Sequence, residues 1–257
     1  MLELRNITKI YNPGTVTEQT LFREFSLTVE EGQFVSIVGS NGSGKTSLLN
    51  IICGSIPVEA GEVLIDGKNI NKLKEYQRYA AMGRVYQNPA AGTCPGLTML
   101  ENLSLADNKG KAFGLSRGVN RQRRDFYCQQ LQSLGLGLED KLDVKMGALS
   151  GGQRQAVALL MATMTPLKFL ILDEHTAALD PKTAEIIMEL TDKVVREKKL
   201  TAMMVTHNLR YAVEYGDRLI MMNQGQAVLD KAGAEKAATS IDDILGVFNQ
   251  ISIECGN

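Results

Sequence analysis

The order of apolar and polar residues predicts strands in the first part of the chain. LELRNITKIY and FREFSLTVEEGQFVSIVG carry apolar residues at alternating positions, the period of a half-buried strand, and Glu31-Gly32 marks a turn. EAGEVLIDGKNI has the pattern of a hairpin with Asp66-Gly67 at its turn. The apolar segment RVYQ, which ends at Gln87, is expected to be a further strand.

The pattern changes at about residue 88 and again at about residue 166. Between these positions apolar residues recur at helical spacing, as in RQRRDFYCQQLQSLGL and SGGQRQAVALLMATM. The later segments KFLILDE and LTAMMVTH are short continuous apolar runs, which are typical of strands buried on both faces. The amphipathic helix PKTAEIIMELTDKVVREKK separates them, and the hairpin DRLIMMNQGQAVLD follows. Strands that alternate with helices indicate an α/β fold with a parallel sheet. Residues 235–257 are expected to form a polar helix pair.

Composition and charge are those of an ordinary globular protein. The 257 residues carry 28 basic and 29 acidic side chains, a formal net charge of −1, and 44% of them are hydrophobic. A chain of this length can bury a core without staples such as disulfides, and the methionines in MATMTP, AMMVTH and LIMMN are expected to fill that core rather than to act as ligands. The near-neutral charge argues against nucleic acid as a partner held by bulk electrostatics.

The cysteines and the apolar segments exclude further classes. Cys53, Cys94, Cys128 and Cys255 are far apart and form no CxxC pair, so we expect reduced cytosolic thiols rather than a zinc cluster or a disulfide scaffold. The N-terminus has an acid at its third position and no apolar core, so no secretory signal is predicted. The longest apolar stretch, 156–172, contains a proline and a lysine, and it is too short to span a bilayer.

A glycine-rich segment is the first candidate for chemistry. GSNGSGKT fits G-x-x-x-x-G-K-[ST] in full, between the predicted strand QFVSIVG and the predicted helix SLLNII. Glycines let backbone N–H groups turn toward phosphate oxygens, and a helix N-terminus adds its positive dipole end. Lys45 is expected to reach the β and γ phosphates of a nucleotide, and Thr46 to ligate Mg²⁺. The other residues of this cradle are Gly39, Ser40, Asn41, Gly42, Ser43 and Gly44.

Two acids follow the buried strand KFLIL. Asp173 and Glu174 stand at the carboxyl end of this strand, where ligands bind in open α/β sheets. We expect Asp173 to hold Mg²⁺ through water, and Glu174 to polarise the attacking water as general base. Acids often end strands for structural reasons alone, and it is the phosphate loop that favours a nucleotide site here.

A second anion cradle opens the helix that precedes this strand. Leu149-Ser150-Gly151-Gly152-Gln153 places a serine and two glycines at a helix start, which also suits a simple N-cap. One protomer cannot easily fold both cradles onto one phosphate. Two copies arranged head to tail can do so, each lending Ser150 to the other's nucleotide. A homodimer held by ATP is therefore expected.

These motifs resemble the ATP-binding cassette family, the ATPase subunits of ABC transporters. GSNGSGKT, LSGGQ, KFLILDE, AALD and a later histidine occur in that family's order, over roughly residues 1–230. The resemblance implies one domain, 1–257, with an α/β P-loop NTPase (RecA-like) core, an antiparallel β subdomain and an inserted α-helical subdomain. The implied boundaries are 1–87 and 166–230 for the core and β subdomain, 88–165 for the helical subdomain with the signature motif, and 231–257 for a C-terminal tail.

The resemblance also assigns roles by position. Tyr11 matches the aromatic residue that stacks on adenine. Gln87 matches the glutamine that senses Mg²⁺ and the attacking water and links to the membrane subunit. Asp180 in AALD matches the loop that crosses the dimer interface, and it also suits an N-cap before Pro181. His207, directly after a buried strand, matches the histidine that contacts the γ-phosphate. The expected catalytic set is Glu174, His207, Lys45 and Gln87.

Two features stand apart from these motifs. His175 occupies the position where the family usually has a proline, and we interpret it as a variant turn residue rather than a second catalytic base. Its ring could still bias the orientation of Glu174. The stretch 109–124 carries six basic residues and no acid. It suits contact with lipid headgroups or a partner, or a solvated helix face and loop, and the second explanation is favoured.

The resemblance implies a Mg²⁺-dependent ATPase that powers a transporter as a peripheral subunit on the cytoplasmic face of the cell membrane. A chain without its own permease is commoner among importers, so the implied partners are polytopic permease subunits and a solute-binding protein. The segment after Gln87 resembles ATPases paired with permeases for nucleosides, sugars or aromatic amino acids. Small and apolar residues there are expected to form the groove that receives the permease: Ala90, Ala91, Pro95, Leu97 and Met99.

Other members of the family are the competing interpretations. A soluble ATPase of iron–sulfur assembly has the same motifs and a similar length, so it stays open as the alternative. A DNA-repair ATPase would need a long coiled coil between Thr46 and Ser150, which lie too close in sequence to contain one. A translation-type member would carry two phosphate loops, and this chain has one.

Overall fold

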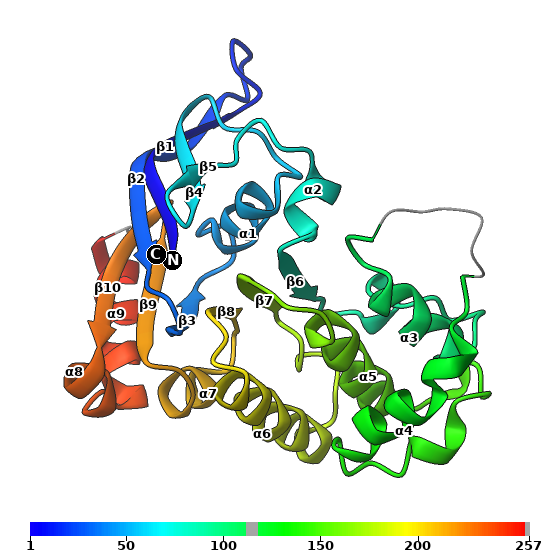
Figure 1. Cartoon of the computed structure of the whole chain (residues 1–257). Helices are drawn as coiled ribbons and strands as arrows, with labels where there is room; N and C mark the ends of the chain where they lie inside the picture. Colours follow the sequence, from blue (N-terminus) through cyan, green and yellow to red (C-terminus); the bar gives the residue numbers. More distant parts are fainter. Residues whose placement is uncertain (112–117, 255–257) are drawn as a thin grey trace. The chain divides into compact units, whose positions relative to one another are not determined.

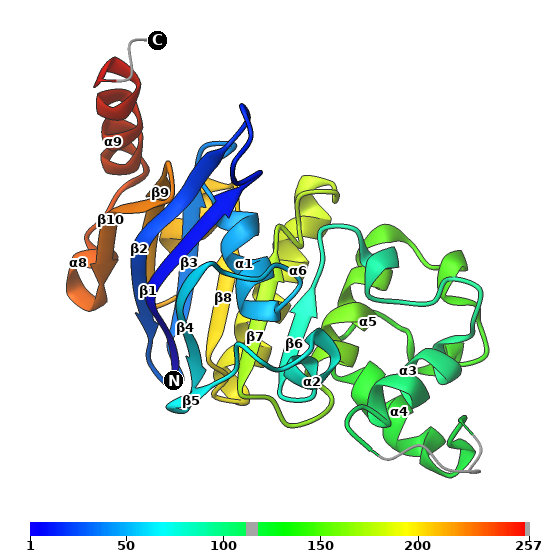
Figure 2. The ribbon, with the colours of Figure 1, turned by 90° about the horizontal axis from the view of Figure 1, so that it is seen from above.

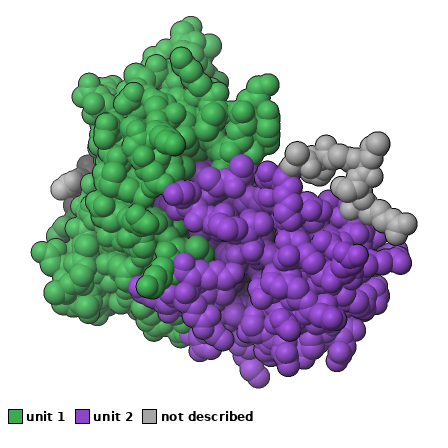
Figure 3. All heavy atoms as spheres, viewed as in Figure 1, with its two compact units in different colours: residues 1–78, 199–257 green, residues 79–198 purple. Residues whose placement is uncertain are grey.

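The computed structural model describes residues 1–111 and 118–254, and its contacts divide the chain into two compact units (Figure 3). Unit 1 comprises Met1–Arg78 and Lys199–Asn257, and unit 2 comprises Tyr79–Lys198. Unit 2 thus contains the whole predicted helical region together with the strand that ends in the acid pair. The subdomain boundaries that the family resemblance implies differ from these units and stay a prediction.

Unit 1 begins with an antiparallel sheet whose strands lie in the order β2-β1-β4-β5 (Figure 2). Leu2 pairs with Val29 on one side and with Ile65 on the other. The predicted hairpin is confirmed, because Asp66 and Gly67 both have positive φ and form the turn between β4 and β5. The strands are β1 (Leu2–Tyr11), β2 (Gln19–Val29), β4 (Ala60–Ile65) and β5 (Lys68–Asn69).

The second group of strands in unit 1 has the order β10-β9-β3-β8. Strand β3 pairs in parallel with both β8 and β9, and β10 closes the group as the antiparallel partner of β9. Every residue of β8 is buried, as its continuous apolar run predicted. Every residue of β3 is buried as well, although its alternating pattern predicted a half-buried strand, because β3 lies between β8 and β9. The strands are β3 (Phe34–Gly39), β8 (Ala202–Val205), β9 (Arg218–Asn223) and β10 (Gln226–Ala232).

The helices of unit 1 include one whose character differs from the prediction. The C-terminal residues do form a helix pair, but α9 is not polar throughout. Ile244 of α9 is fully buried against Val38, Ala212, Leu219 and Met221, because its apolar residues recur at helical spacing. The helices are α1 (Lys45–Cys53), α2 (Glu75–Tyr79, at the boundary of the units), α7 (Leu209–Glu214), α8 (Gly233–Ala237) and α9 (Ile241–Glu254).

Unit 2 combines a parallel strand pair with helices (Figure 1). Strand β6 (Met82–Val85) pairs in parallel with β7 (Phe169–Asp173), and the predicted helical region 88–165 is confirmed. The α-helices are α3 (Met99–Asp107), α4 (Arg124–Gln132), α5 (Gly151–Thr163) and α6 (Pro181–Glu197). Single 3₁₀ turns connect them: η1 (Pro89–Ala91), η2 (Arg121–Arg123), η3 (Glu139–Lys141) and η4 (Met146–Ala148).

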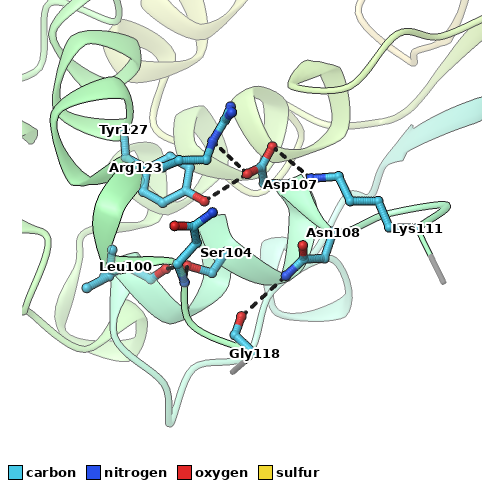
Figure 4. A network of polar contacts seen from close by, with 9 residues as sticks. Leu100, Ser104, Asp107, Asn108, Lys111, Gly118, Arg123 and Tyr127 are labelled. Atoms are coloured by element: carbon cyan, nitrogen blue, oxygen red, sulfur yellow. Dashed lines mark hydrogen bonds and ion pairs between the residues drawn. The ribbon is translucent and has the colours of Figure 1, made fainter. Parts of the chain in front are cut away.

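The basic stretch 109–124 lies partly outside the described residues, since 112–117 are not described. Several of its described cations contact groups of unit 2 itself (Figure 4). Arg123 and Lys111 approach the carboxylate of Asp107 at 2.8 and 3.8 Å, and Arg124 pairs with Asp143. The hydroxyl of the buried Tyr127 donates to the same Asp107 carboxylate at 3.0 Å. These contacts favour the structural explanation for the described part of the stretch.

The remaining predictions concern the methionines and the cysteines. The methionines of AMMVTH and LIMMN are at most 1% exposed and fill the core of unit 1. The prediction is wrong for MATMTP, because Met161 and Met164 are only partly buried and Met161 lines a cavity of unit 2. Cys53 is buried, Cys94 is exposed and Cys128 is partly buried, whereas Cys255 lies outside the described residues. Of the helices within 1–111 and 118–254, none combines the length and the apolar character that a membrane span requires.

Candidate nucleotide site

The predicted phosphate loop joins the end of β3 to the start of α1. Gly39 has a φ of 154°, and a side chain there would place a Cβ atom 2.3 Å from the carbonyl oxygen of Met222, so only glycine fits. Gly44 is the N-cap of α1 in the left-handed conformation, and no side chain caps this helix. The first N–H groups of α1 and its positive dipole end therefore face the loop. Ser40, Asn41, Gly42 and Thr46 are exposed around it.

Lys45 lies inside the loop rather than on its surface. It is 5% exposed, and its ammonium donates to the carbonyl oxygens of Gly39 at 2.7 Å and Ser40 at 2.9 Å. The Ser43 hydroxyl lies 3.4 Å from the same nitrogen. The loop thus positions one cation beside the uncapped helix start, which is the arrangement that binds phosphate.

His207 and Tyr11 lie in the same unit as the phosphate loop. In the parallel pair of β3 and β8, Ile37 is opposite Val205, so Gly39 and His207 both stand two residues further along their strands. His207 is exposed at this edge. Tyr11 ends β1, and its hydroxyl donates to the Ser47 hydroxyl of α1 at 3.0 Å. Its partly exposed ring is therefore held beside the helix that follows the loop.

In unit 2 the strand ends bring the acid pair and the predicted glutamine together. Val85 of β6 is opposite Leu172 of β7, so Gln87 and Glu174 both lie two residues beyond this pair. Gln87 is exposed and Glu174 partly buried. Glu174 has a φ of 49°, which is uncommon for a residue other than glycine and marks a tight turn after the strand. Asp173, Glu174 and Gln87 therefore share one edge.

Arg84 is a residue of this edge that the sequence analysis missed. It lies on β6, its side chain is 8% exposed, and its guanidinium contacts the Asp173 carboxylate at 2.6 Å. The same guanidinium lies over the ring of Tyr86, 4.8 Å from its centre. The sequence feature that could have revealed this contact is the lone cation in the apolar segment RVYQ, because a buried cation requires a partner.

The signature segment forms the start of α5, and its residues have local partners. Ser150 and Gln153 form a capping box, each side chain accepting from the other's backbone N–H at 3.2 Å. A side chain at Gly152 would place a Cβ atom 2.1 Å from the Thr183 methyl group of α6, so this glycine lets the two helices approach. Gly151 has more room, with Leu179 at 3.4 Å. The N-cap explanation thus holds for Ser150, which stays exposed at the helix start.

Two residues that flank the acid pair have structural partners. Asp180 is the exposed N-cap of α6 and accepts from the Thr183 backbone N–H at 3.1 Å. Hydrogen bonds with the Thr183 side chain and with this N–H lower the pKa of the Asp180 carboxyl group. His175 is 2% exposed, and its Nε2 lies 3.0 Å from the Thr191 hydroxyl of α6. Burial lowers the pKa of His175 to about 4, so the ring is neutral at pH 7. His175 is therefore a buried turn residue without access to water.

The predicted groove after Gln87 differs in its lining. Met99 begins α3 and is fully buried, so it cannot contact a partner, because it packs inward as the first apolar residue of the helix. Ala91, Pro95 and Leu97 are exposed. A cavity of about 410 Å³ lies nearby within unit 2, between β6, α3 and α5. Its lining includes Tyr79, Met82, Tyr86, Leu105 and Met161, together with Arg84 and Lys109.

The donor atoms predicted to hold a metal ion suit Mg²⁺. Thr46 offers a hydroxyl oxygen and Asp173 a carboxylate oxygen, and Mg²⁺ prefers few protein oxygens together with phosphate oxygens and water. Within the described residues no cluster of three His, Cys, Asp or Glu side chains could hold a metal without such a ligand. Each of these two donors therefore suits a metal ion that arrives with a nucleotide.

Known proteins resemble this chain over most of its length. The model of the ABC transporter family matches residues 22–177. The chain belongs to the ABC transporter family. It is 47% identical over 248 residues to a tyrosine transport ATP-binding protein of Clostridioides difficile, with 96% of this chain and 98% of the relative covered.

Solved structures of ABC cassettes have the same fold. One is the dimeric, post-hydrolysis state of a cassette bound to ADP and phosphate, with a TM-score of 0.74, 34% identity, and coverage of 90% of this chain and 98% of that one. Another is a nucleotide-free cassette of an ABC transporter, with a TM-score of 0.79, 26% identity, and coverage of 100% and 99%. The chain is thus an ATP-binding and ATP-hydrolysing subunit of a transporter, which favours transport over the iron–sulfur alternative.

Proposed function

We propose that this ABC subunit drives the import of a small solute, and that the solute is an aromatic amino acid. The support is the relative of nearly equal length whose name gives tyrosine as its transported solute. The solute would bind to permease subunits and a solute-binding protein, so nothing in this chain would touch it. The observation that carries the ATPase function is the position of Lys45, held by two carbonyl oxygens inside the phosphate loop.

The nucleotide is proposed to bind at the exposed rim of this loop. The uncapped start of α1 offers backbone N–H groups to the phosphates, and Lys45 would exchange its carbonyl partners for phosphate oxygens. The Tyr11 ring, held by its bond to Ser47, would stack on the adenine. Mg²⁺, held by Thr46 and through water by Asp173, would neutralise charge on the phosphates when bound.

Hydrolysis is proposed to use the residues at the strand ends. Glu174 would accept a proton from the water that attacks the γ-phosphorus, as the bond from that phosphorus to the β–γ bridging oxygen breaks. Gln87 would orient this water. His207 would donate to a γ-phosphate oxygen and stabilise the charge that develops there. The products are ADP and inorganic phosphate.

The complete site is proposed to need a second copy of the chain. Ser150, Gly151, Gly152 and Gln153 of one copy would contact the γ-phosphate held by the phosphate loop of the other. Ser150 is exposed at the start of a 13-residue helix, so its hydroxyl and the local N–H groups can face a partner. Asp180 would line the same interface. Loss of the γ-phosphate would then let the two copies separate.

The permease is proposed to dock on the cavity of unit 2, at the cytoplasmic face of the membrane. We commit to a short amphipathic helix as the occupant. Its apolar side chains would cover Leu105, which is 47% exposed beside the cavity, and a carboxylate on it would meet Lys109. Burial lowers the pKa of Lys109 to about 8, so this ammonium gains from an anionic partner.

The ATPase part is tested with Lys45→Ala and a matched control, Lys72→Ala, which removes an exposed lysine of the same unit. We expect Lys45→Ala to lower ATP turnover by at least about 100-fold, since it removes the cation facing the phosphates. The control should keep wild-type turnover. Normal turnover in purified Lys45→Ala would refute the site.

The solute is tested in cells that lack the transporter and receive it back with either variant. We expect the wild type and Lys72→Ala to restore uptake of labelled tyrosine, and Lys45→Ala to fail. Restored uptake of a nucleoside or a sugar instead would overturn the proposed solute without affecting the ATPase result.

The shared site is tested with Glu174→Gln, which should retain ATP but not hydrolyse it. We expect this variant to become dimeric with ATP, and to stay monomeric with ADP or without nucleotide, in size-exclusion chromatography with light scattering. Adding Ser150→Arg should prevent the dimer, because a bulky side chain enters the second cradle. A Glu174→Gln protein that is saturated with ATP at high concentration and remains monomeric would contradict the shared site.

A further inference from the structure

The turn that carries the proposed general base has a strained backbone. Glu174 has the left-handed backbone conformation, and its carbonyl oxygen accepts from the Ala177 N–H at 2.9 Å. A strained turn persists only where its surroundings hold it. The next residue, His175, points away from the exposed strand edge and into unit 2, where it is 2% exposed.

The hydrogen-bond pattern around His175 has one consistent assignment of protons. Its partner Thr191 is fully buried on α6, and the Thr191 hydroxyl lies 2.7 Å from the carbonyl oxygen of Ile187. A threonine hydroxyl has one proton, and the carbonyl can only accept, so that proton goes to Ile187. The Thr191 oxygen must then accept from His175 at 3.0 Å. The imidazole therefore carries its proton on Nε2.

This bond connects the strained turn to the middle of a long helix. Thr191 lies on α6 eleven residues after the N-cap of that helix, so the anchor point is part of a rigid element of the same unit. The ring itself is buried and engaged, so it cannot receive a proton from the attacking water. His175 can act on the reaction only through the position of its neighbour.

We propose that His175 is a positioning residue for Glu174, and that its Nε2–H bond to Thr191 keeps the Glu174 carboxylate directed at the attacking water. The proposal rests on the proposed role of Glu174 as general base. Without the bond, the turn after β7 can relax from its strained conformation and move the carboxylate. A general base must lie within hydrogen-bond reach of the proton that it accepts, so a small displacement lowers the rate of the chemical step.

The test uses a pair of variants at each end of the bond. His175→Leu removes the donor, and Thr191→Val removes the acceptor with almost no change of shape. His175→Gln places an amide N–H near the position of Nε2, and Thr191→Ser keeps the hydroxyl, so these two serve as matched controls. The measurements are kcat and KM for ATP, the affinity for ATP under non-hydrolysing conditions, and the melting temperature.

We expect His175→Leu and Thr191→Val each to lower kcat by about 10- to 100-fold, with KM and ATP affinity within about threefold of wild type. His175→Gln and Thr191→Ser should recover most of the rate. The double variant His175→Leu/Thr191→Val should be no slower than either single variant, because the two residues act through one bond. If His175→Leu fails to fold, Thr191→Val carries the same test.

Several outcomes would overturn the proposal. A wild-type kcat in Thr191→Val would show that the bond between His175 and Thr191 does not affect the reaction. Equal losses of kcat in His175→Leu and His175→Gln would show that the Nε2–H donor does not affect it. A fall in kcat matched by weaker ATP binding and a lower melting temperature would make His175 merely structural. The failure of the proposed function is recognised separately: Glu174→Gln would then retain wild-type turnover, whatever the variants of His175 do.

Discussion

Arg78 closes the end of the helix that follows the phosphate loop, and its removal should destabilise unit 1. Its guanidinium is buried and donates to the carbonyl oxygens of Ile51 at 2.8 Å and Ile52 at 3.0 Å, which belong to the last turn of α1. It also reaches the carbonyl oxygens of Asn71 and Leu73, both at 3.2 Å. Carbonyl groups at a helix end have no partner within the helix, and a cation there also complements the dipole. The perturbation is Arg78→Met, which keeps the apolar stem and removes the donors.

The size of the effect follows from these contacts. A hydrogen bond to a charged group contributes roughly 1.5 to 3 kcal/mol net, but burial opposes the charged form of Arg78 and lowers its pKa. Counting only the two short bonds to α1, and discounting them for this desolvation, we expect Arg78→Met to lower the free energy of unfolding by about 3 kcal/mol. For a chain of this size that corresponds to a fall in melting temperature of roughly 6 to 12 °C.

The chain has no tryptophan, so unfolding is best followed by circular dichroism, with thermal and urea melts of wild type and variant. The matched control is Arg210→Met, which removes an exposed i,i+4 pair with Glu214 and should change stability by less than about 0.5 kcal/mol. ATP binding by folded Arg78→Met should remain near wild type, since the guanidinium lies at the opposite end of α1 from the phosphate loop. A melting temperature within about 2 °C of wild type would refute this account of Arg78.

Three further variants test other parts of the structure. Tyr11→Ala should raise the KM for ATP by about tenfold or more, because the stacking on adenine is lost. Tyr11→Phe loses only the bond to Ser47 and should bind ATP nearly as well as wild type. Equal ATP affinity of the alanine and phenylalanine variants would refute stacking. Arg84→Gln should lower the Mg²⁺ concentration needed for half-maximal ATP binding, because it removes the cation beside Asp173, and a fluorescent nucleotide titrated with Mg²⁺ measures this. The lowered pKa of Lys109 means that the folded chain gives up this proton at a lower pH than the unfolded chain does. The stability of wild type relative to Lys109→Met should therefore rise between about pH 8 and pH 10, as urea midpoints would record, and a fall would contradict the sign.

Much of this protein was determined by local features of its sequence. The phosphate loop was predictable because its glycines, Lys45 and Thr46 are consecutive, and because a strand pattern precedes them and a helix pattern follows. The position of the acid pair was predictable because a continuous apolar run marks a strand buried on both faces, and Asp173 ends it. The order of the motifs was enough to identify the family. In each case the sequence pattern that carries the prediction lies within one continuous stretch of the chain.

The contacts that tertiary structure alone decided join residues that are distant in sequence. Arg84 and Asp173 are 89 positions apart, and nothing in either segment specifies that the guanidinium meets the carboxylate. The methyl group of Thr183 makes glycine necessary at position 152, which the sequence suggested only as part of an anion cradle. The apolar face of α9 and the burial of Met99 were missed because burial depends on which neighbour covers a side chain.

His175 shows most clearly the difference between what the sequence determines and what the tertiary structure determines. The sequence alone placed it in a turn after a strand and left its ring nitrogens without an assignment. The structure supplies Thr191, 16 positions away on α6, and Thr191 in turn is committed to the Ile187 carbonyl. The groups that packing places beside a side chain decide its hydrogen-bond partner and which of its atoms carries the proton. Packing brings together residues that no local sequence pattern connects.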